Sequence, residues 1–163
     1  MFASFLVALA VTAQTATLTF TKPSAWTDRA AASSMRVAEF VVPRASGDAE
    51  DGELIVYYFG GGGGSVEANL QRWTSQFESI KDPARTMMTV NGLRLTSLDV
   101  SGTYVAEMRP GSSERYNKPG FRMRATVVET PKGPYFIKLT GPAKTIESAG
   151  AAFDQFLHTL AFK

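Results

Sequence analysis

Two segments of the chain carry apolar residues at alternating spacings of three and four, which is the pattern of an amphipathic helix. The first predicted helix spans residues 65–80 and ends at Asp82-Pro83, and the second begins after Gly141-Pro142. Their apolar stripes are Val66, Leu70, Trp73, Phe77 and Ile80 in the first, and Ile146, Ala149, Phe153, Phe156, Leu157 and Leu160 in the second.

Between and before these helices, short runs of apolar and β-branched residues predict strands. The strand over residues 53–59 is apolar on both sides, so we expect it at the centre of a sheet that is covered on both faces. Asn91-Gly92 is a hairpin signal. The order of elements predicts an α+β fold, with a largely antiparallel six- or seven-stranded sheet and two main helices packed on it. The predicted strands cover residues 17–20, 35–42, 53–59, 86–90, 93–100, 121–129 and 135–140.

Composition narrows the classes of function. The 163 residues suit one domain, predicted over residues 14–163, and the net charge of +2 is too weak to indicate a nucleic-acid partner. The absence of cysteine excludes disulfides, thiol catalysis and cysteine metal sites, and the single histidine, His158, excludes a multi-histidine site. We therefore predict no metal and no cofactor.

The first thirteen residues are predicted to be a signal peptide. Residues 5–11 form a short apolar run, and the small residues of Val11-Thr12-Ala13 suit cleavage after Ala13. The alternative is a buried N-terminal strand or helix. Export to the periplasm or the exterior is expected, without a lipid anchor because the chain has no cysteine, and no later segment is long enough to span a membrane.

A run of five glycines before the first helix is the first candidate site. A glycine-rich turn that leads into a helix can present backbone N–H groups to an anion. The lysine of a phosphate-binding P-loop is absent, because Ser65 follows Gly64 directly. The alternative is a flexible connection in which Ser65 caps the helix. The candidate residues are Gly61, Gly62, Gly63, Gly64 and Ser65.

A polar ridge on the first helix is the second candidate. Asn69, Arg72 and Gln76 lie at i, i+3 and i+7, beside Trp73, so they would flank the glycine run. Such a ridge could bind a carboxylate or a glycan. The alternative is that these side chains satisfy backbone groups or face water.

A basic strip on the last two strands is the third candidate. If Pro131-Lys132-Gly133 forms a three-residue hairpin loop, Thr126 pairs with Lys138, and Arg122, Arg124 and Lys138 share one face of the sheet. The strip could meet an acidic partner. The alternative is a solvated face whose bases pair with acids elsewhere, and a slip of one residue would dissolve the strip.

The remaining ionisable residues predict no catalytic centre. His158 is placed four residues after Asp154, a surface pair without a serine nucleophile motif. Asp48, Glu50, Asp51 and Glu53 lack the spacing of a calcium loop. Catalytic residues are therefore not assigned.

Several stretches resemble a group of uncharacterised exported bacterial proteins. These are Gly63 to Trp73, the strand over residues 121–129, the segment 133–142 and the ending Phe153-Asp154-Gln155-Phe156-Leu157. The layout from Tyr135 to Leu160 is also similar to the PsbP/DcrB-like fold, whose members act mainly as accessory or binding proteins. The resemblance implies the fold, and it brings no functional residue with it.

These observations favour an exported accessory or binding protein whose partner is a protein or a small anionic ligand. Two alternatives stay open. The first is a small secreted hydrolase that uses two carboxylates on carbohydrate, which two acids converging in a cleft would favour. The second is a structural protein of the cell envelope, which a surface without a concave pocket would favour.

Overall fold

A computed structural model describes residues 16–163, apart from the side chain of Asp82. The predicted signal peptide, residues 1–13, lies outside the described residues. The elements in chain order are β1 (Leu18–Thr19), β2 (Thr27–Arg29), β3 (Arg36–Val42), β4 (Gly52–Tyr58), α1 (Val66–Thr74), β5 (Phe77–Val90), β6 (Leu93–Tyr104), β7 (Lys118–Glu129), β8 (Tyr135–Pro142), α2 (Ala143–Ser148), α3 (Gly150–His158) and β9 (Ala161–Phe162).

Seven strands form one antiparallel sheet in the order β2-β3-β4-β8-β7-β6-β5, and β1 pairs with β9 in a separate two-stranded sheet. The prediction of an α+β fold with a six- or seven-stranded antiparallel sheet is therefore confirmed. Strand β8 is central, because it returns after the β5-β6-β7 meander and inserts between β4 and β7. No helix in the described part of the chain is long and apolar enough to cross a membrane.

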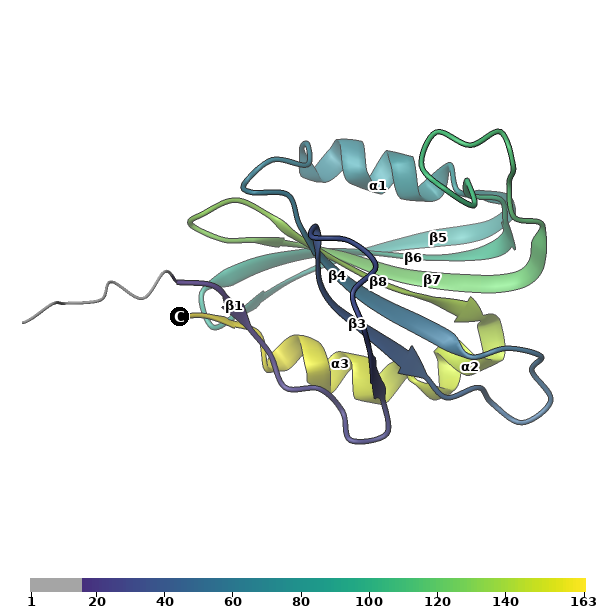
Figure 1. Cartoon of the computed structure of the whole chain (residues 1–163), viewed down its shortest axis with the longest axis horizontal. Coiled ribbons are helices and arrows are strands. Elements are labelled where there is room, and N and C mark those ends of the chain that lie inside the picture. The colour runs from purple at the N-terminus through teal and green to yellow at the C-terminus, as the bar shows by residue number, and fades with distance from the viewer. Residues whose placement is uncertain (1–15) are drawn as a thin grey trace, which may run out of the picture.

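The sheet lies between two unequal layers (Figure 1). On one face, α2 and α3 pack on the sheet, and the predicted stripe of the second helix is buried there from Ile146 to Leu160. On the other face lies α1, which buries Leu70 and Trp73 against β6, β7 and β8. The alternation of inward and outward side chains along each central strand produces these two separate cores.

The first helix is shorter than the apolar spacing predicts. It ends at Thr74, and the chain continues directly into β5, so the prediction that the helix runs to residue 80 is wrong. Phe77 instead pairs with Tyr104 of β6. A bulge at Ser79, with φ of 51°, adds a residue to the strand, so Phe77 and Ile80 still pack on the same core despite their spacing of three. Strand pairing therefore satisfies a stripe that also fits a helix.

Two further elements differ from the prediction. The second helix is divided at Ala149 into α2 and α3, although its apolar stripe stays continuous. Residues 27–29 form an edge strand, β2, that was not among the predicted strands, and their side chains are exposed. Exposed positions carry no apolar alternation, which explains why the pattern does not reveal this strand.

The register of the last hairpin differs from the predicted one by one residue. Gly133 N–H donates to the Thr130 carbonyl at 3.0 Å, which closes a tighter turn, and Lys138 pairs with Ala125 instead of Thr126. A slip of one residue moves a side chain to the other face of the sheet. Lys138 therefore lies on the α1 face, whereas Arg122 and Arg124 lie on the α2–α3 face.

Candidate functional site

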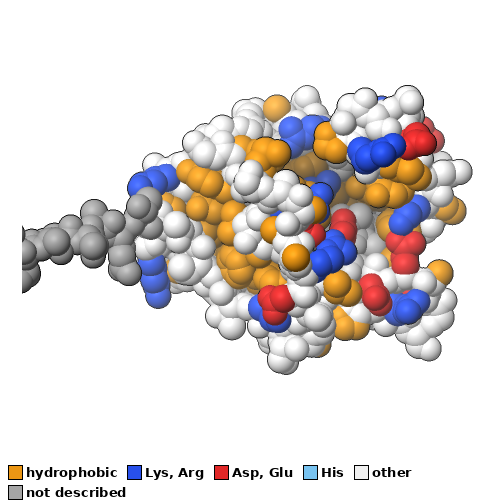
Figure 2. Space-filling view, in the orientation of Figure 1, with side chains coloured by type: hydrophobic (Ala, Val, Ile, Leu, Met, Phe, Trp, Pro, Cys, Tyr) orange, Lys and Arg blue, Asp and Glu red, His pale blue; other side chains and the backbone are white. Residues whose placement is uncertain are grey.

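The α1 face of the sheet is only partly covered, and a cavity of about 640 Å³ lies beside the helix. Figure 2 shows the hollow on this face, with basic and acidic side chains around it. Its volume falls in the range of ligand pockets, about 300–1,000 Å³. We call it the central cavity. Its lining comes from β3, β4, β8, the end of α1 and the segment that follows β6.

The floor of the central cavity is formed by the two middle strands. Ile55 and Tyr57 of β4 point into it, beside Lys138 and Thr140 of β8. The prediction that β4 is apolar on both sides and central to the sheet is confirmed. Its second face, however, lines a cavity and is not sealed by a helix, which leaves Tyr57 and Phe59 half-buried.

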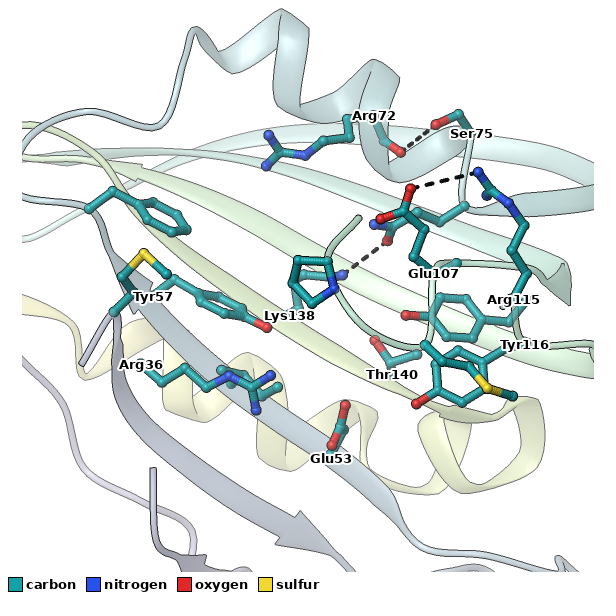
Figure 3. Close-up of a pocket in the computed structure, with 18 residues that line it drawn as sticks. Arg36, Glu53, Tyr57, Arg72, Ser75, Glu107, Arg115, Tyr116, Lys138 and Thr140 are labelled. Atoms are coloured by element: carbon teal, nitrogen blue, oxygen red, sulfur yellow. Dashed lines mark hydrogen bonds and ion pairs between the residues drawn. The ribbon is translucent and has the colours of Figure 1, made fainter. Parts of the chain in front are cut away.

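The walls of the central cavity come from distant parts of the chain. Arg72, Ser75 and Gln76 close one side at the end of α1. The opposite wall is the segment over residues 105–117, where Glu107 and Arg115 form an isolated β-bridge. Tyr104 and Tyr116 stack at this end with ring centroids 5.6 Å apart. Figure 3 shows Arg72 and Ser75 on one side of the cavity and Glu107, Arg115 and Tyr116 on another.

Lys138 is the central polar group of the floor. Its Nζ donates to Gln76 Oε1 at 3.0 Å, and no described carboxylate forms an ion pair with it. Burial lowers the pKa of Lys138 to about 8, helped by the positive charges of Arg72 and Arg36 and opposed by the negative charge of Glu53. About a tenth of the Lys138 amines are therefore neutral at pH 7, and the neutral share grows as the pH rises toward 8.

Arg72 differs from every other arginine of the chain. Among the described side chains, nine of the ten arginines have a carboxylate oxygen within ion-pair distance, and Arg72 has none. Its guanidinium donates only to Asn69 Oδ1, a neutral acceptor. Arg72 is exposed and lines the cavity with Lys138, so two cations without anionic partners face one space.

Two acids, Glu53 and Glu107, also line the central cavity, but at its rim. Their side chains are 45% and 41% exposed, and each is paired with an arginine, Arg29 at 2.6 Å and Arg115 at 3.8 Å. A glycosidase acid needs a raised pKa, which burial away from positive charge provides. These two carboxylates are instead partly exposed, and each lies beside an arginine.

Two tyrosines of the central cavity are neutral hydrogen-bonding groups. Burial raises the pKa of Tyr57 and of Tyr104 above the ordinary value of a phenol. Arg36 lies over the ring of Tyr57, with its guanidinium carbon 5.7 Å from the ring centroid. The cavity thus combines aromatic surface, phenol donors and cationic groups, a set that suits a small organic anion.

The glycine run has a structural part in the site. Asn69 is fully buried, and its Nδ2 donates to the Gly63 and Ser65 carbonyls at 2.8 Å, so this side chain holds the loop and does not face solvent. Ser65 Oγ accepts from Ala68 N–H at 3.1 Å, which confirms Ser65 as the N-cap. Gly63 packs against Phe136. Gly61 and Gly62 do not line the central cavity.

The predicted basic strip does not form. Arg122 binds Asp99 through two hydrogen bonds at 2.8 and 2.6 Å, and Arg124 binds Asp154 at 2.6 Å, both on the α2–α3 face. Lys138 is on the opposite face because of the register difference. The prediction of one basic strip is therefore wrong. Arg122 and Arg124 are paired with acids on one face of the sheet, and Lys138 lies alone on the other.

The other acidic candidates are held in local contacts. Glu50 pairs with Lys118 at 2.6 Å, Asp51 with Arg44 at 3.6 Å, and Asp48 accepts from the Thr145 hydroxyl. His158 is exposed at the end of α3. Its predicted partner Asp154 is bound to Arg124, as described above.

Of the ridge Asn69, Arg72 and Gln76, the structure brings the last two to the central cavity. Sequence reasoning missed Tyr57, Tyr104 and Arg36 as lining residues, and it assigned Lys138 to the wrong face. One signal was present: Tyr57 and Phe59 are large aromatic side chains on the side of β4 that a short helix could not fully cover. The segment 105–117, in contrast, gave no sign that it forms a wall.

Comparison with known proteins supports the fold alone. No known family model matches the chain, and no curated protein matches it in sequence. The crystal structure of PA94, a protein of unknown function from Pseudomonas aeruginosa, aligns with a TM-score of 0.55 and 14% identity, over 94% of this chain and 88% of that one. The solution structure of cyanobacterial PsbP from Synechocystis sp. PCC 6803 aligns with a TM-score of 0.48 and 11% identity, over 97% and 99% of the two chains. The chain therefore shares its overall fold with PA94.

Proposed function

We propose that the protein is a binding protein that holds a small carboxylate-bearing ligand in the central cavity. The observation that carries this proposal is the pair of cations, Arg72 and Lys138, which face the cavity with only neutral hydrogen-bond partners. Each of the other nine arginines has one of the chain's own carboxylates within ion-pair distance. A missing partner inside a cavity therefore points to an anion from outside.

The energetics of the cavity support an anionic ligand. Hydrogen bonds from a charged donor to a carboxylate are roughly twice as strong as neutral ones. They also strengthen where surrounding protein excludes water. A carboxylate beside Lys138 would restore the pKa that burial lowers, so binding and protonation of the amine would favour each other.

The two alternatives receive less support from the site. Carbohydrate hydrolysis would need a buried acid, and the two carboxylates of the cavity are exposed and ion-paired. A purely structural protein has no use for a concave, partly aromatic cavity with free cations.

Titration of the isotope-labelled protein with benzoate, at constant ionic strength, tests the proposal by NMR. We expect saturable shifts of residues around the cavity, and an affinity that falls by about tenfold or more in Arg72→Gln, as for the loss of a charge-assisted hydrogen bond. Arg94→Gln is the matched control, because Arg94 is exposed, pairs with Glu129 and lies away from the cavity.

Equal affinity in wild type, Arg72→Gln and Arg94→Gln would contradict the proposal, and so would shifts that do not saturate. Inorganic phosphate and acetate, titrated in parallel, report whether the cavity needs the apolar part of the ligand. Tighter binding of benzoate than of acetate is expected, because aromatic side chains line the cavity.

We further propose that the protein works outside the cytoplasm, since residues 1–13 have the pattern of a signal peptide. Fractionation of the producing cell, with N-terminal sequencing of the recovered protein, tests this. A mature chain that begins at Gln14 outside the cytoplasm is expected, and an uncleaved chain in the cytoplasm would contradict it.

A further inference from the structure

A recess of about 150 Å³ lies under α1 and shares five lining residues with the central cavity. An engineered cavity of this volume in another protein accommodates benzene. Four of the lining side chains are aromatic, and the amine of Lys138 and the guanidinium of Arg72 supply the only positive charges of the lining. The residues are Tyr57, Phe59, Arg72, Trp73, Gln76, Phe136 and Lys138.

We propose that Lys138 is a nucleophilic amine that condenses reversibly with the carbonyl group of a small 2-oxo acid, whose carboxylate Arg72 binds. This inference rests on the proposed function, because it assigns a chemical class to the ligand of the same cavity. A 2-oxo acid carries a carboxylate and a carbonyl on adjacent carbons, so it can engage the guanidinium and the amine together.

Three features of Lys138 suit this chemistry. Among the described side chains its one hydrogen-bond partner is Gln76 Oε1, at 3.0 Å, which can accept an N–H from a neutral amine and leave the nitrogen lone pair directed elsewhere. No described carboxylate pairs with the amine and holds it in the charged form. The walls of the recess are aromatic, and a desolvated lysine next to another cation is a known way to activate an amine.

The condensation balances without any cofactor. The Lys138 nitrogen lone pair attacks the carbonyl carbon, the π electrons move to the oxygen, and that oxygen takes a proton as the nitrogen loses one. The resulting carbinolamine then loses water, formed from its hydroxyl and a proton, and the remaining N–H proton is released to leave a neutral imine. Figure 3 shows the Tyr57 hydroxyl directed into the cavity near Lys138, where a neutral phenol can donate a hydrogen bond to the developing oxyanion.

The other lysines do not share this environment. Lys22 and Lys118 pair with acids, Lys144 donates to the Ser46 carbonyl, and Lys81, Lys132 and Lys163 are exposed to solvent. With a pKa of about 8, roughly a tenth of Lys138 is neutral at pH 7, against fewer than about one in a thousand for an ordinary lysine. Lys138 is therefore expected to react first when a carbonyl compound is limiting.

Trapping with pyruvate and sodium cyanoborohydride tests the inference. The reagent reduces an imine to a stable secondary amine, and peptide mapping by mass spectrometry locates it. We expect Lys138 to be modified at least about tenfold faster than Lys132 at pH 7, given the difference in neutral amine. Arg72→Gln should slow the reaction at Lys138 but not at Lys132, and lactate, which has the carboxylate without the carbonyl, should compete.

Modification of Lys138 at the same rate as Lys132 would overturn the inference. A rate at Lys138 that changes neither in Arg72→Gln nor when lactate is added would also overturn the inference, because the carboxylate of the 2-oxo acid would then not contribute to binding. If benzoate binding depends on Arg72 while pyruvate leaves Lys138 unmodified, the proposed binding function is supported and the proposed condensation at Lys138 is wrong. All comparisons use wild type and Arg72→Gln, an exposed substitution whose fold is checked by circular dichroism.

Discussion

One face of the seven-stranded sheet lies under α2, α3 and the β1–β9 pair, whereas the opposite face lies under α1 and the segment 105–117, which leave a cavity between them (Figure 1). In the described part of the chain, the core of the covered face contains 19 buried apolar residues, against 10 on the α1 face. The short α1, which ends at Thr74, leaves the floor strands β4 and β8 open beside it.

The two faces also treat their charges differently. On the α2–α3 face, Arg122 and Arg124 are neutralised by Asp99 and Asp154. On the α1 face, none of the described carboxylates pairs with Arg72 or Lys138. Charges that are paired internally stabilise a surface at most modestly, whereas unpaired charges beside a cavity are available to a ligand. The comparison separates a face that is closed by helices from a face that keeps a cavity, where we propose that a ligand binds.

The largest expected effect is on the covered face. Phe156 is 1% exposed and contacts the rings of Phe20, Trp26 and Phe40, so Phe156→Ala should lower the free energy of unfolding by about 3–5 kcal/mol. Phe59 lines the cavity and is half-buried, so Phe59→Ala should cost only about 1–2 kcal/mol. Urea unfolding of both variants measures the difference, and equal losses would show that the two faces support the fold equally.

A smaller effect is expected in the glycine run, where the backbone has φ of +109° at Gly63 and +66° at Gly60. A methyl group at Gly63 would lie 2.6 Å from a carbon of the buried Phe136 ring, whereas one at Gly60 would meet nothing within 4 Å. Gly60→Ala should cost about 1–2 kcal/mol for the left-handed backbone alone. Gly63→Ala should cost about 1–3 kcal/mol more, because the ring must move.

Thermal unfolding of the two alanine variants side by side measures that difference. The difference in melting temperature between the two variants tests whether the glycine run is packed into the α1 core or is a free connection. Equal melting temperatures would favour the free connection, and would remove the packing part that the structure gives to Gly63.

Local patterns predicted most of the covered face and little of the open one. The stripe from Ile146 to Leu160 is a strong helical signal because one face of the helix is buried along its length. The last hairpin was assigned its strands correctly but a register one residue off. The turn at Thr130 and Gly133 is tighter than a three-residue loop, and this detail placed Lys138 on the wrong face.

The central cavity could not be predicted, because its walls come together only in the folded chain. Along the sequence, Glu107 follows Arg72 by 35 residues and Lys138 follows Glu107 by 31 residues. The apolar spacing that fits a helix up to Ile80 also hid the early end of α1, and that end is what opens the cavity. A local pattern reports which side chains become buried, but not where two distant elements leave a gap.

The smallest expected effect is a pH dependence of stability that comes from Lys138 on the α1 face. Because the pKa of Lys138 is lowered from 10.5 to about 8 by folding, the unfolded chain binds more protons between these two pH values. The free energy of unfolding of the wild type should therefore rise as pH increases from about 8 to 10.5. This gain is lost again as pH falls through 8, where the buried amine becomes charged. Lys138→Met removes the buried charge, so at pH 7 the variant should be more stable than the wild type.

A shift of this size corresponds to about 3 kcal/mol as an upper limit, and partial exposure of Lys138 reduces it to on the order of 1–2 kcal/mol. Urea unfolding of both proteins at pH 7 and at pH 10.5 measures the difference, which should shrink at the higher pH. Lys132→Met is the control, because Lys132 is exposed in the last hairpin turn and should show no such trend. A Lys138→Met variant that is less stable than wild type at pH 7 would mean that the amine supports the fold. The open face would then hold its own charges in place, as the covered face does, and Lys138 would not be free for a ligand.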